Sequence, residues 1–196
     1  MSSIAAVLLA AGESKRMGQN KSLLPWINDQ SLIAFQTNSL VEAGFGPIVV
    51  VLGHQASEVK PAIPNLPSVS VVENKDYKLG RSGSVIRGLK ELPDDIDGVV
   101  ILNVDSPRNV SVLRSLRIAF ESSGGSLAVL SYQGEAGHPW LFPTALMPEL
   151  LTINEAGLGL REVESRHQEK WLLVETDSPT SLTNINSPED YKTSHS

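Results

Sequence analysis

The sequence contains no cysteine, so the chain can form neither a disulfide framework nor a metal site built on thiolates. Basic residues are in the minority, with 16 lysines and arginines against 22 aspartates and glutamates, and no basic stripe suggests a nucleic-acid partner. The N-terminal apolar run is too short to cross a membrane, and it lacks the basic start of a signal peptide. We therefore expect a cytoplasmic protein that binds neither nucleic acid nor a membrane.

Apolar residues make up 41% of the 196 residues, which is typical of a globular protein with a sizeable core. We expect residues 1–196 to form a single domain. Apolar, β-rich runs alternate with helix-like segments along the chain. The expected strands are 5–9, 48–52, 69–73, 98–103, 127–131 and 171–174. The expected helices are 31–43, 84–92 and 110–122.

This alternation predicts a three-layer, doubly wound α/β fold with a mostly parallel sheet, similar to the Rossmann fold. The continuous apolar character of the expected strands indicates that both faces of each strand are buried. Ligands of such folds bind beyond the carboxyl ends of the strands. Segments that follow the first and fourth strands are therefore the first places to look for a functional site.

The segment after the first strand is the most informative part of the chain. The apolar run ends at Gly12, and Ser14, Arg16, Gly18 and Lys21 follow within ten positions. Backbone N–H groups and hydroxyls of such a loop can face an anion, and the arginine and lysine add full positive charge. The spacing fits neither a P-loop, G-x-x-x-x-G-K-[ST], nor the dinucleotide motif G-x-G-x-x-G.

The same segment resembles the G-x-S-x-R-M-G-x-x-K signature of the MobA/MocA-like nucleotidyltransferases, a family that attaches nucleotides to molybdopterin and related acceptors. The resemblance implies that Arg16 and Lys21 are catalytic. The resemblance also implies nucleotide contacts at Ala10, Ala11, Gly12 and Ser14. The alternative interpretation is an ordinary βα loop with surface charges.

Residues 74–89 resemble a second segment of that family, N-x-x-[WY]-x-x-G-x-x-x-S-x-x-x-G-L. The resemblance implies that Gly80, Ser82 and Ser84 lie against the nucleotide. Small residues with hydroxyl or backbone groups suit recognition of a base at close range. The same serines also suit the N-cap of the next helix, and both roles are compatible.

Two polar residues are candidates for holding Mg²⁺. Asp105 follows a strong strand, and a carboxylate there would face the crevice, where phosphate oxygens and waters complete the octahedron of the ion. The family's D-x-P motif implies the same role, and the alternative is a turn aspartate before a proline. Residues 184–190 resemble the family ending D-[IV]-D-T-P-E-D, which implies that Asn186 is a second ligand. Asparagine replaces the usual aspartate there, so one negative charge is lost.

Two further segments resemble the acceptor side of the family. Residues 137–142 resemble G-[HN]-P-x-x-[FL], which implies a substrate role for His138, whereas a lone histidine is more often structural or solvated. Residues 156–161 stand where the family has G-D-x-G-A-R. Arg161 is retained there, but Gly157 replaces the aspartate. This difference suggests an acceptor other than molybdopterin, or weaker binding of it.

The resemblance implies transfer of a nucleoside monophosphate from a nucleoside triphosphate to a phosphorylated acceptor such as molybdopterin, with release of pyrophosphate and Mg²⁺ as cofactor. Residues 10–12 of this chain are Ala-Ala-Gly, as is typical of the cytidylyltransferases of the family, whereas the guanylyltransferases show Ala-Gly-Gly. The resemblance therefore favours CTP. Two alternatives remain open. One is a sugar-phosphate nucleotidyltransferase, and the other is a non-catalytic module that carries a nucleotide or cofactor to a client molybdoenzyme.

Overall fold

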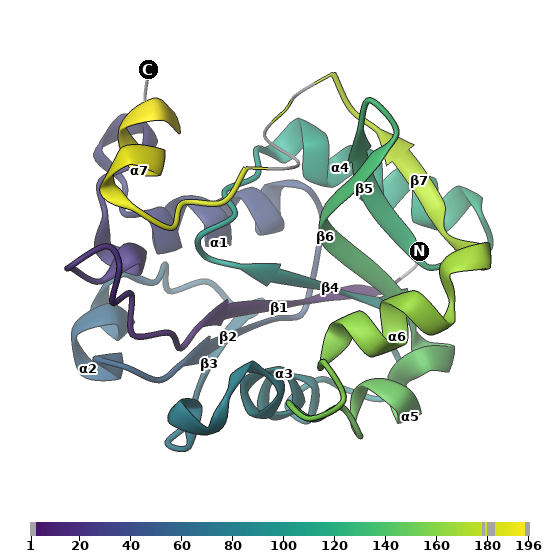
Figure 1. The fold of residues 1–196 in the computed structure, drawn as a ribbon, viewed down its shortest axis with the longest axis horizontal. Helices are drawn as coiled ribbons and strands as arrows, with labels where there is room; N and C mark the ends of the chain where they lie inside the picture. Colours follow the sequence, from purple (N-terminus) through teal and green to yellow (C-terminus); the bar gives the residue numbers. More distant parts are fainter. Residues whose placement is uncertain (1–2, 178, 180–182, 195–196) are drawn as a thin grey trace.

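The computed structural model describes residues 3–177, 179 and 183–194. Within them, seven strands form one sheet in the order β3-β2-β1-β4-β6-β5-β7 (Figure 1). The strands are β1 (Ile4–Ala10), β2 (Ile48–Leu52), β3 (Val69–Glu73), β4 (Gly98–Asn103), β5 (Ala128–Tyr132), β6 (Glu135–Pro143) and β7 (Leu172–Glu175). The helices are α1 (Leu32–Glu42), α2 (Ala56–Val59), α3 (Arg81–Leu89), α4 (Val110–Ser122), α5 (Met147–Leu150), α6 (Leu160–Arg166) and α7 (Pro188–Ser194). The expected three-layer, mostly parallel α/β fold is therefore confirmed.

The sheet buries two separate apolar clusters, one on each face. Side chains of β1 point alternately to the two faces, so that Ala6 and Leu8 join one cluster while Val7 and Leu9 join the other. Helices α1 and α4 cover the first face, and α3, α5 and α6 cover the second (Figure 1). All strands pair in parallel except β6, which is antiparallel to both β4 and β5. The carboxyl ends of β1 and β4 therefore meet at one edge of the sheet.

The structure differs from the expected elements in several respects, and helices α2, α5 and α6 were not among those expected. Strands β3 and β7 are not buried on both faces, because they form the two edges of the sheet, where β3 exposes Ser70 and Glu73 and β7 exposes Leu173 and Glu175. Helix α3 begins at Arg81, three residues earlier than expected. Strand β6 was not expected, because glycine and proline interrupt its apolar pattern. The structure forms it through a tight turn at Gln133 and Gly134, both with positive φ.

The described helices include none that is long and apolar enough to cross a membrane.

Candidate functional site

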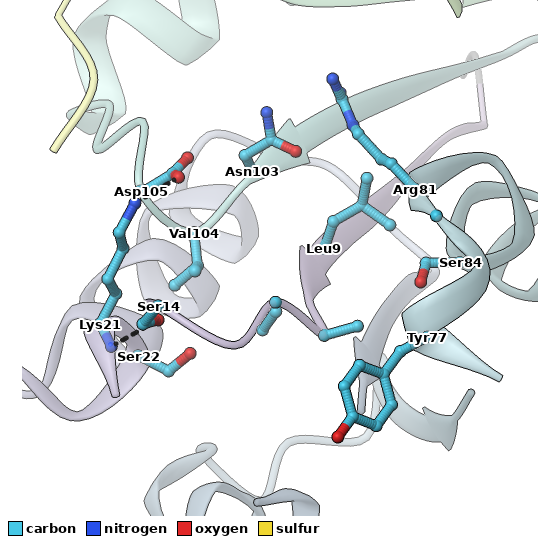
Figure 2. Close-up of a pocket in the computed structure, with 14 residues that line it drawn as sticks. Leu9, Ser14, Lys21, Ser22, Tyr77, Arg81, Ser84, Asn103, Val104 and Asp105 are labelled. Atoms are coloured by element: carbon cyan, nitrogen blue, oxygen red, sulfur yellow. Dashed lines mark hydrogen bonds and ion pairs between the residues drawn. The ribbon is translucent and has the colours of Figure 1, made fainter. Parts of the chain in front are cut away.

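A cavity of about 320 Å³ opens at the carboxyl ends of β1 and β4 (Figure 2). Its lining comes from the loop after β1, from the start of α3 and from the end of β4. The lining residues are Leu9, Ala10, Ala11, Gly12, Ser14, Lys21, Ser22, Tyr77, Gly80, Arg81, Ser84, Asn103, Val104 and Asp105. Eight of the residues predicted from the sequence lie here, and they are Ala10, Ala11, Gly12, Ser14, Lys21, Gly80, Ser84 and Asp105.

The loop after β1 is folded around Ser14. Its hydroxyl accepts a hydrogen bond from the backbone N–H of Lys21 at 3.1 Å, and its carbonyl accepts one from Met17 at 2.9 Å. Gly18 has φ of 72°, a left-handed conformation that glycine adopts without steric cost. The short 3-10 helix η1 (Lys21–Leu23) then begins, and it turns the lysine side chain inward. The loop therefore places one lysine at the cavity by local hydrogen bonding.

Lys21 joins two segments that are distant in the sequence. Its Nζ lies 3.0 Å from Oδ2 of Asp105 and 3.1 Å from Oδ1 of Asn186, and the residue is only 8% exposed. Arg16 is exposed and does not line the cavity, but its guanidinium donates to the same Asn186 oxygen at 3.2 Å. The predicted catalytic pair and the predicted metal ligands thus form one polar cluster.

The cluster depends on a buried arginine that the sequence did not single out. Arg108 is 1% exposed, and its side chain donates to the carbonyls of Pro107 at 2.9 Å, His138 at 2.8 Å and Thr183 at 3.2 Å. The backbone N–H of Ile185 also donates to the Asp105 carbonyl at 2.7 Å. These bonds hold the C-terminal segment that carries Asn186 against the loop that carries Asp105.

Replacing Arg108 by methionine should lower the free energy of unfolding by about 3 kcal/mol, because buried carbonyls lose their donor. Burial lowers the pKa of Arg108 to about 10, so the guanidinium is still charged at neutral pH. Urea denaturation measures the loss. The matched control is Arg114→Met, since Arg114 also donates to a distant carbonyl, that of Glu42, but is exposed. Equal stability of the two variants would contradict the bracing role of Arg108.

The Asp105 and Asn186 oxygens suit a divalent cation whose other ligands come from elsewhere. Both are hard oxygen ligands, and in this structure both accept a hydrogen bond from the ammonium group of Lys21, which shows that the two oxygens can approach one cation. Among the described residues, no group of three or more histidine, aspartate or glutamate side chains could hold a metal by itself. Mg²⁺ commonly takes one or two protein ligands together with substrate phosphates and waters, so the pair fits that ion.

The start of α3 forms the opposite wall of the cavity. Gly80 has φ of 122°, a conformation that side chains rarely adopt, and it turns the chain into the helix. The hydroxyl of Ser84 accepts a hydrogen bond from Nδ2 of the buried Asn74 at 2.9 Å, which leaves its own hydrogen for a ligand. Ser82 does not line this cavity, although the sequence predicted a nucleotide contact for it. It faces a second cavity on the other side of α3's first turn.

The second cavity has a volume of about 310 Å³. Its lining residues are Arg81, Ser82, Val85, His138, Ile153, Glu155, Leu158, Gly159, Leu160, Arg161 and Glu164. Both residues predicted on the acceptor side, His138 and Arg161, lie here, apart from the Lys21 cluster. The segment 137–142 lies in the largely buried strand β6, and His138 is the one residue of it that lines the cavity.

Two arginines, Arg81 and Arg161, and two glutamates, Glu155 and Glu164, line the second cavity. Burial and, to a smaller extent, the nearby Arg81, Arg108 and Arg161 together lower the pKa of His138 to about 4, so the ring is neutral at pH 7. Burial also raises the pKa of Glu164. Gly157, where the family has aspartate, does not line this cavity. Its backbone N–H donates to Oδ1 of Asn154 at 2.8 Å, so its effect on a ligand there would be indirect.

A family model described as the MobA-like NTP transferase domain matches residues 6–171. The molybdenum cofactor cytidylyltransferase of Escherichia coli K12 is 25% identical over 195 residues, which is 98% of this chain and 96% of that protein. Nicotine blue oxidoreductase of Paenarthrobacter nicotinovorans is 27% identical over 178 residues, 87% of this chain and 84% of that protein.

The bifunctional protein GlmU of Anaeromyxobacter dehalogenans is 34% identical over 109 residues, which cover 53% of this chain but only 22% of GlmU. Among solved structures, a nucleotidyl transferase from Methanothermobacter, Mth528, superposes with a TM-score of 0.82 at 26% identity, covering 100% of this chain and 97% of that one. Rv0371c of Mycobacterium tuberculosis, in complex with manganese, gives 0.75 at 27% identity, covering 99% and 98%.

Proposed function

The chain belongs to the MobA-like NTP transferase family, and from this premise we propose that it transfers a nucleoside monophosphate from a nucleoside triphosphate to a phosphorylated acceptor, with release of pyrophosphate. The observation that carries the proposal is the meeting of Lys21, Asp105 and Asn186 at the mouth of the first cavity. A cation and hard oxygen donors at the carboxyl ends of parallel strands suit a bound triphosphate.

The protein's work in this reaction is to position the substrates and stabilise charge. An oxygen of the acceptor phosphate bonds to the α-phosphorus, and pyrophosphate leaves from the opposite side. Before the substrates bind, Asp105 and Asn186 hold Lys21 at the cavity, so its positive charge is already beside the place where the phosphates would lie. Arg16 adds a second positive charge at the rim of the cluster. A phosphate dianion is already nucleophilic, so no general base is required.

We propose that Asp105 and Asn186 hold Mg²⁺ when the nucleotide is bound. The ion would neutralise charge on the phosphates, as divalent ions do in phosphoryl transfer. The manganese complex of the related Rv0371c supports a divalent-ion site in the family.

We propose that the nucleotide is CTP. Ala11 lines the cavity, and its methyl group takes space that glycine at the same position would leave to a purine. Calorimetric titration with CTP, GTP, ATP and UTP, each with and without Mg²⁺, tests this directly. We expect magnesium-dependent binding that favours CTP over GTP by about tenfold or more, or about 1.4 kcal/mol. Ala11→Gly should reduce that preference. Tenfold tighter binding of GTP would contradict the CTP assignment.

The second cavity is the proposed site of the acceptor, with His138 and Arg161 as contacts. Molybdopterin is the first acceptor to test, because a molybdenum cofactor cytidylyltransferase aligns with nearly the whole chain. A client molybdoenzyme would then receive the product.

A sugar-phosphate nucleotidyltransferase is the second candidate, favoured by the alignment of 109 residues with GlmU. Screening molybdopterin and sugar phosphates as acceptors separates the two. A non-catalytic nucleotide-binding module is also consistent with asparagine at position 186, and pyrophosphate release with any acceptor would eliminate it. Another relative, nicotine blue oxidoreductase, is named for a different class of reaction. Nucleotide transfer by this chain should therefore be measured directly.

A further inference from the structure

Arg81 lies between the two cavities. It is the first residue of α3, and among the described residues that line either cavity it alone lines both. Figure 2 shows its side chain extending from the helix toward Asn103 at the end of β4. A guanidinium in this position can contact ligands in both cavities at once.

The Arg81 guanidinium lies near carboxylates of both cavities but is not paired with any of them in the part of the chain that the structure describes. Among the described residues, its guanidinium makes no ion pair and donates no hydrogen bond, whereas Lys21 is paired with Asp105. Its charge acts on both cavities, because it interacts electrostatically with Glu164 most strongly and with Glu155 and His138 in the second cavity, and with Asp105 beside the first. The donors of the guanidinium are therefore available to ligands.

The backbone of Arg81 is held in a defined position even though its side chain is exposed. The Glu155 carboxylate accepts a hydrogen bond from the N–H of Ser82 at 2.6 Å, which anchors the first turn of α3. Gly80 fixes the direction in which the chain enters the helix. The Arg81 side chain thus projects from a rigid point at the boundary of the two cavities.

The proposed reaction brings two negatively charged phosphates together, to within about 3–3.5 Å at the reacting atoms. Their repulsion must be offset at the point of contact. A guanidinium is planar and carries five N–H donors, so it can hold oxygens of two phosphates at once, which a single ammonium does less well. Arg16 lines neither cavity, and Arg161 lines only the second.

We propose that Arg81 is a catalytic residue shared by both substrates, which holds the phosphate of the acceptor against the phosphate that is transferred. This inference rests on the proposed function. In the step, an acceptor oxygen forms a bond to the α-phosphorus, and the bond from that phosphorus to the oxygen of the β-phosphate breaks. Pyrophosphate leaves with the electron pair. Arg81 stabilises the charge and forms no covalent bond.

The test measures the binding of two separate probes to the full chain. The first is magnesium with the nucleoside triphosphate that the wild type binds best, measured by calorimetry. The second is phenyl phosphate, followed through the NMR signals of the His138 ring. Arg81→Gln should raise the Kd of both probes by about tenfold, the effect of losing one charged hydrogen-bonding partner. Arg161→Gln should weaken only phenyl phosphate.

The matched control is Arg87→Gln on the same helix, because Arg87 is exposed and paired with Glu91 at 3.1 Å. It should change neither Kd. If Arg81→Gln weakens one probe only, or neither, the shared role is overturned while the proposed function stands. A wild type that binds the nucleotide but not phenyl phosphate also overturns the inference alone. A wild type that binds no nucleotide contradicts the proposed function itself, and the inference with it.

Discussion

Replacing Lys21 by alanine is expected to lower the turnover number by roughly 10²–10³-fold, the usual cost of removing one group that stabilises charge in the transition state. The structure supports a large effect because the ammonium is nearly buried and fixed by two partners, at 3.0 Å from Asp105 and 3.1 Å from Asn186. Pyrophosphate release in the presence of acceptor, with saturating nucleotide, measures it. The Kd of the nucleotide should rise much less than turnover falls.

The control for Lys21→Ala is Lys15→Ala in the same loop. Lys15 is exposed and pairs with Glu13 at 2.9 Å, so its removal changes the loop's net charge equally without touching the cavity. Its turnover should stay within about twofold of the wild type. Wild-type turnover in Lys21→Ala would remove this lysine from the mechanism. Thermal unfolding of both variants checks that each is folded. We expect Lys21→Ala to fold, because the Asp105 side chain is partly exposed and water can solvate it when Lys21 is removed.

Replacing Asp105 by asparagine is expected to lower turnover by a similar factor, roughly 10²–10³. The substitution keeps the size of the side chain and an oxygen that can accept from Lys21, but it removes the negative charge. Because Asn186 is already neutral, the variant would leave the proposed magnesium site with two amide oxygens and no carboxylate. The magnesium concentration that gives half-maximal activity should therefore rise by about tenfold or more.

A magnesium titration of pyrophosphate release distinguishes loss of metal affinity from loss of structure. Asp95→Asn serves as the control, since Asp95 is exposed and precedes β4, at the end of the strand opposite to Asp105. It should leave both turnover and the magnesium dependence unchanged. An Asp105→Asn enzyme with the wild-type magnesium dependence would show that the ion is held elsewhere.

Most of the fold was predictable because its signals are local. Strands β2, β3 and β4 and helix α4 have the bounds expected from their apolar patterns. Strand β6 was not predictable in the same way, because Gly137 and Pro139 interrupt its pattern. Its pairing with β4 and β5 supplies the hydrogen bonds that the local sequence does not favour. Position in the sheet, which exposes the edge strands β3 and β7, is likewise a property of the whole fold.

By itself the sequence determined the kind of chemistry available, because a glycine-containing loop with Ser14, Arg16 and Lys21 after a buried strand is encoded within a few residues. Only the tertiary structure decided how the other polar residues meet. Lys21 is 84 residues from Asp105 and 165 from Asn186, and no local preference selects such partners. The same holds for the burial of Arg108 and for Arg81 at the boundary of two cavities. A polar side chain acquires its partners from the packing of distant segments, so its role is settled when the sheet and its covering helices bring those segments together.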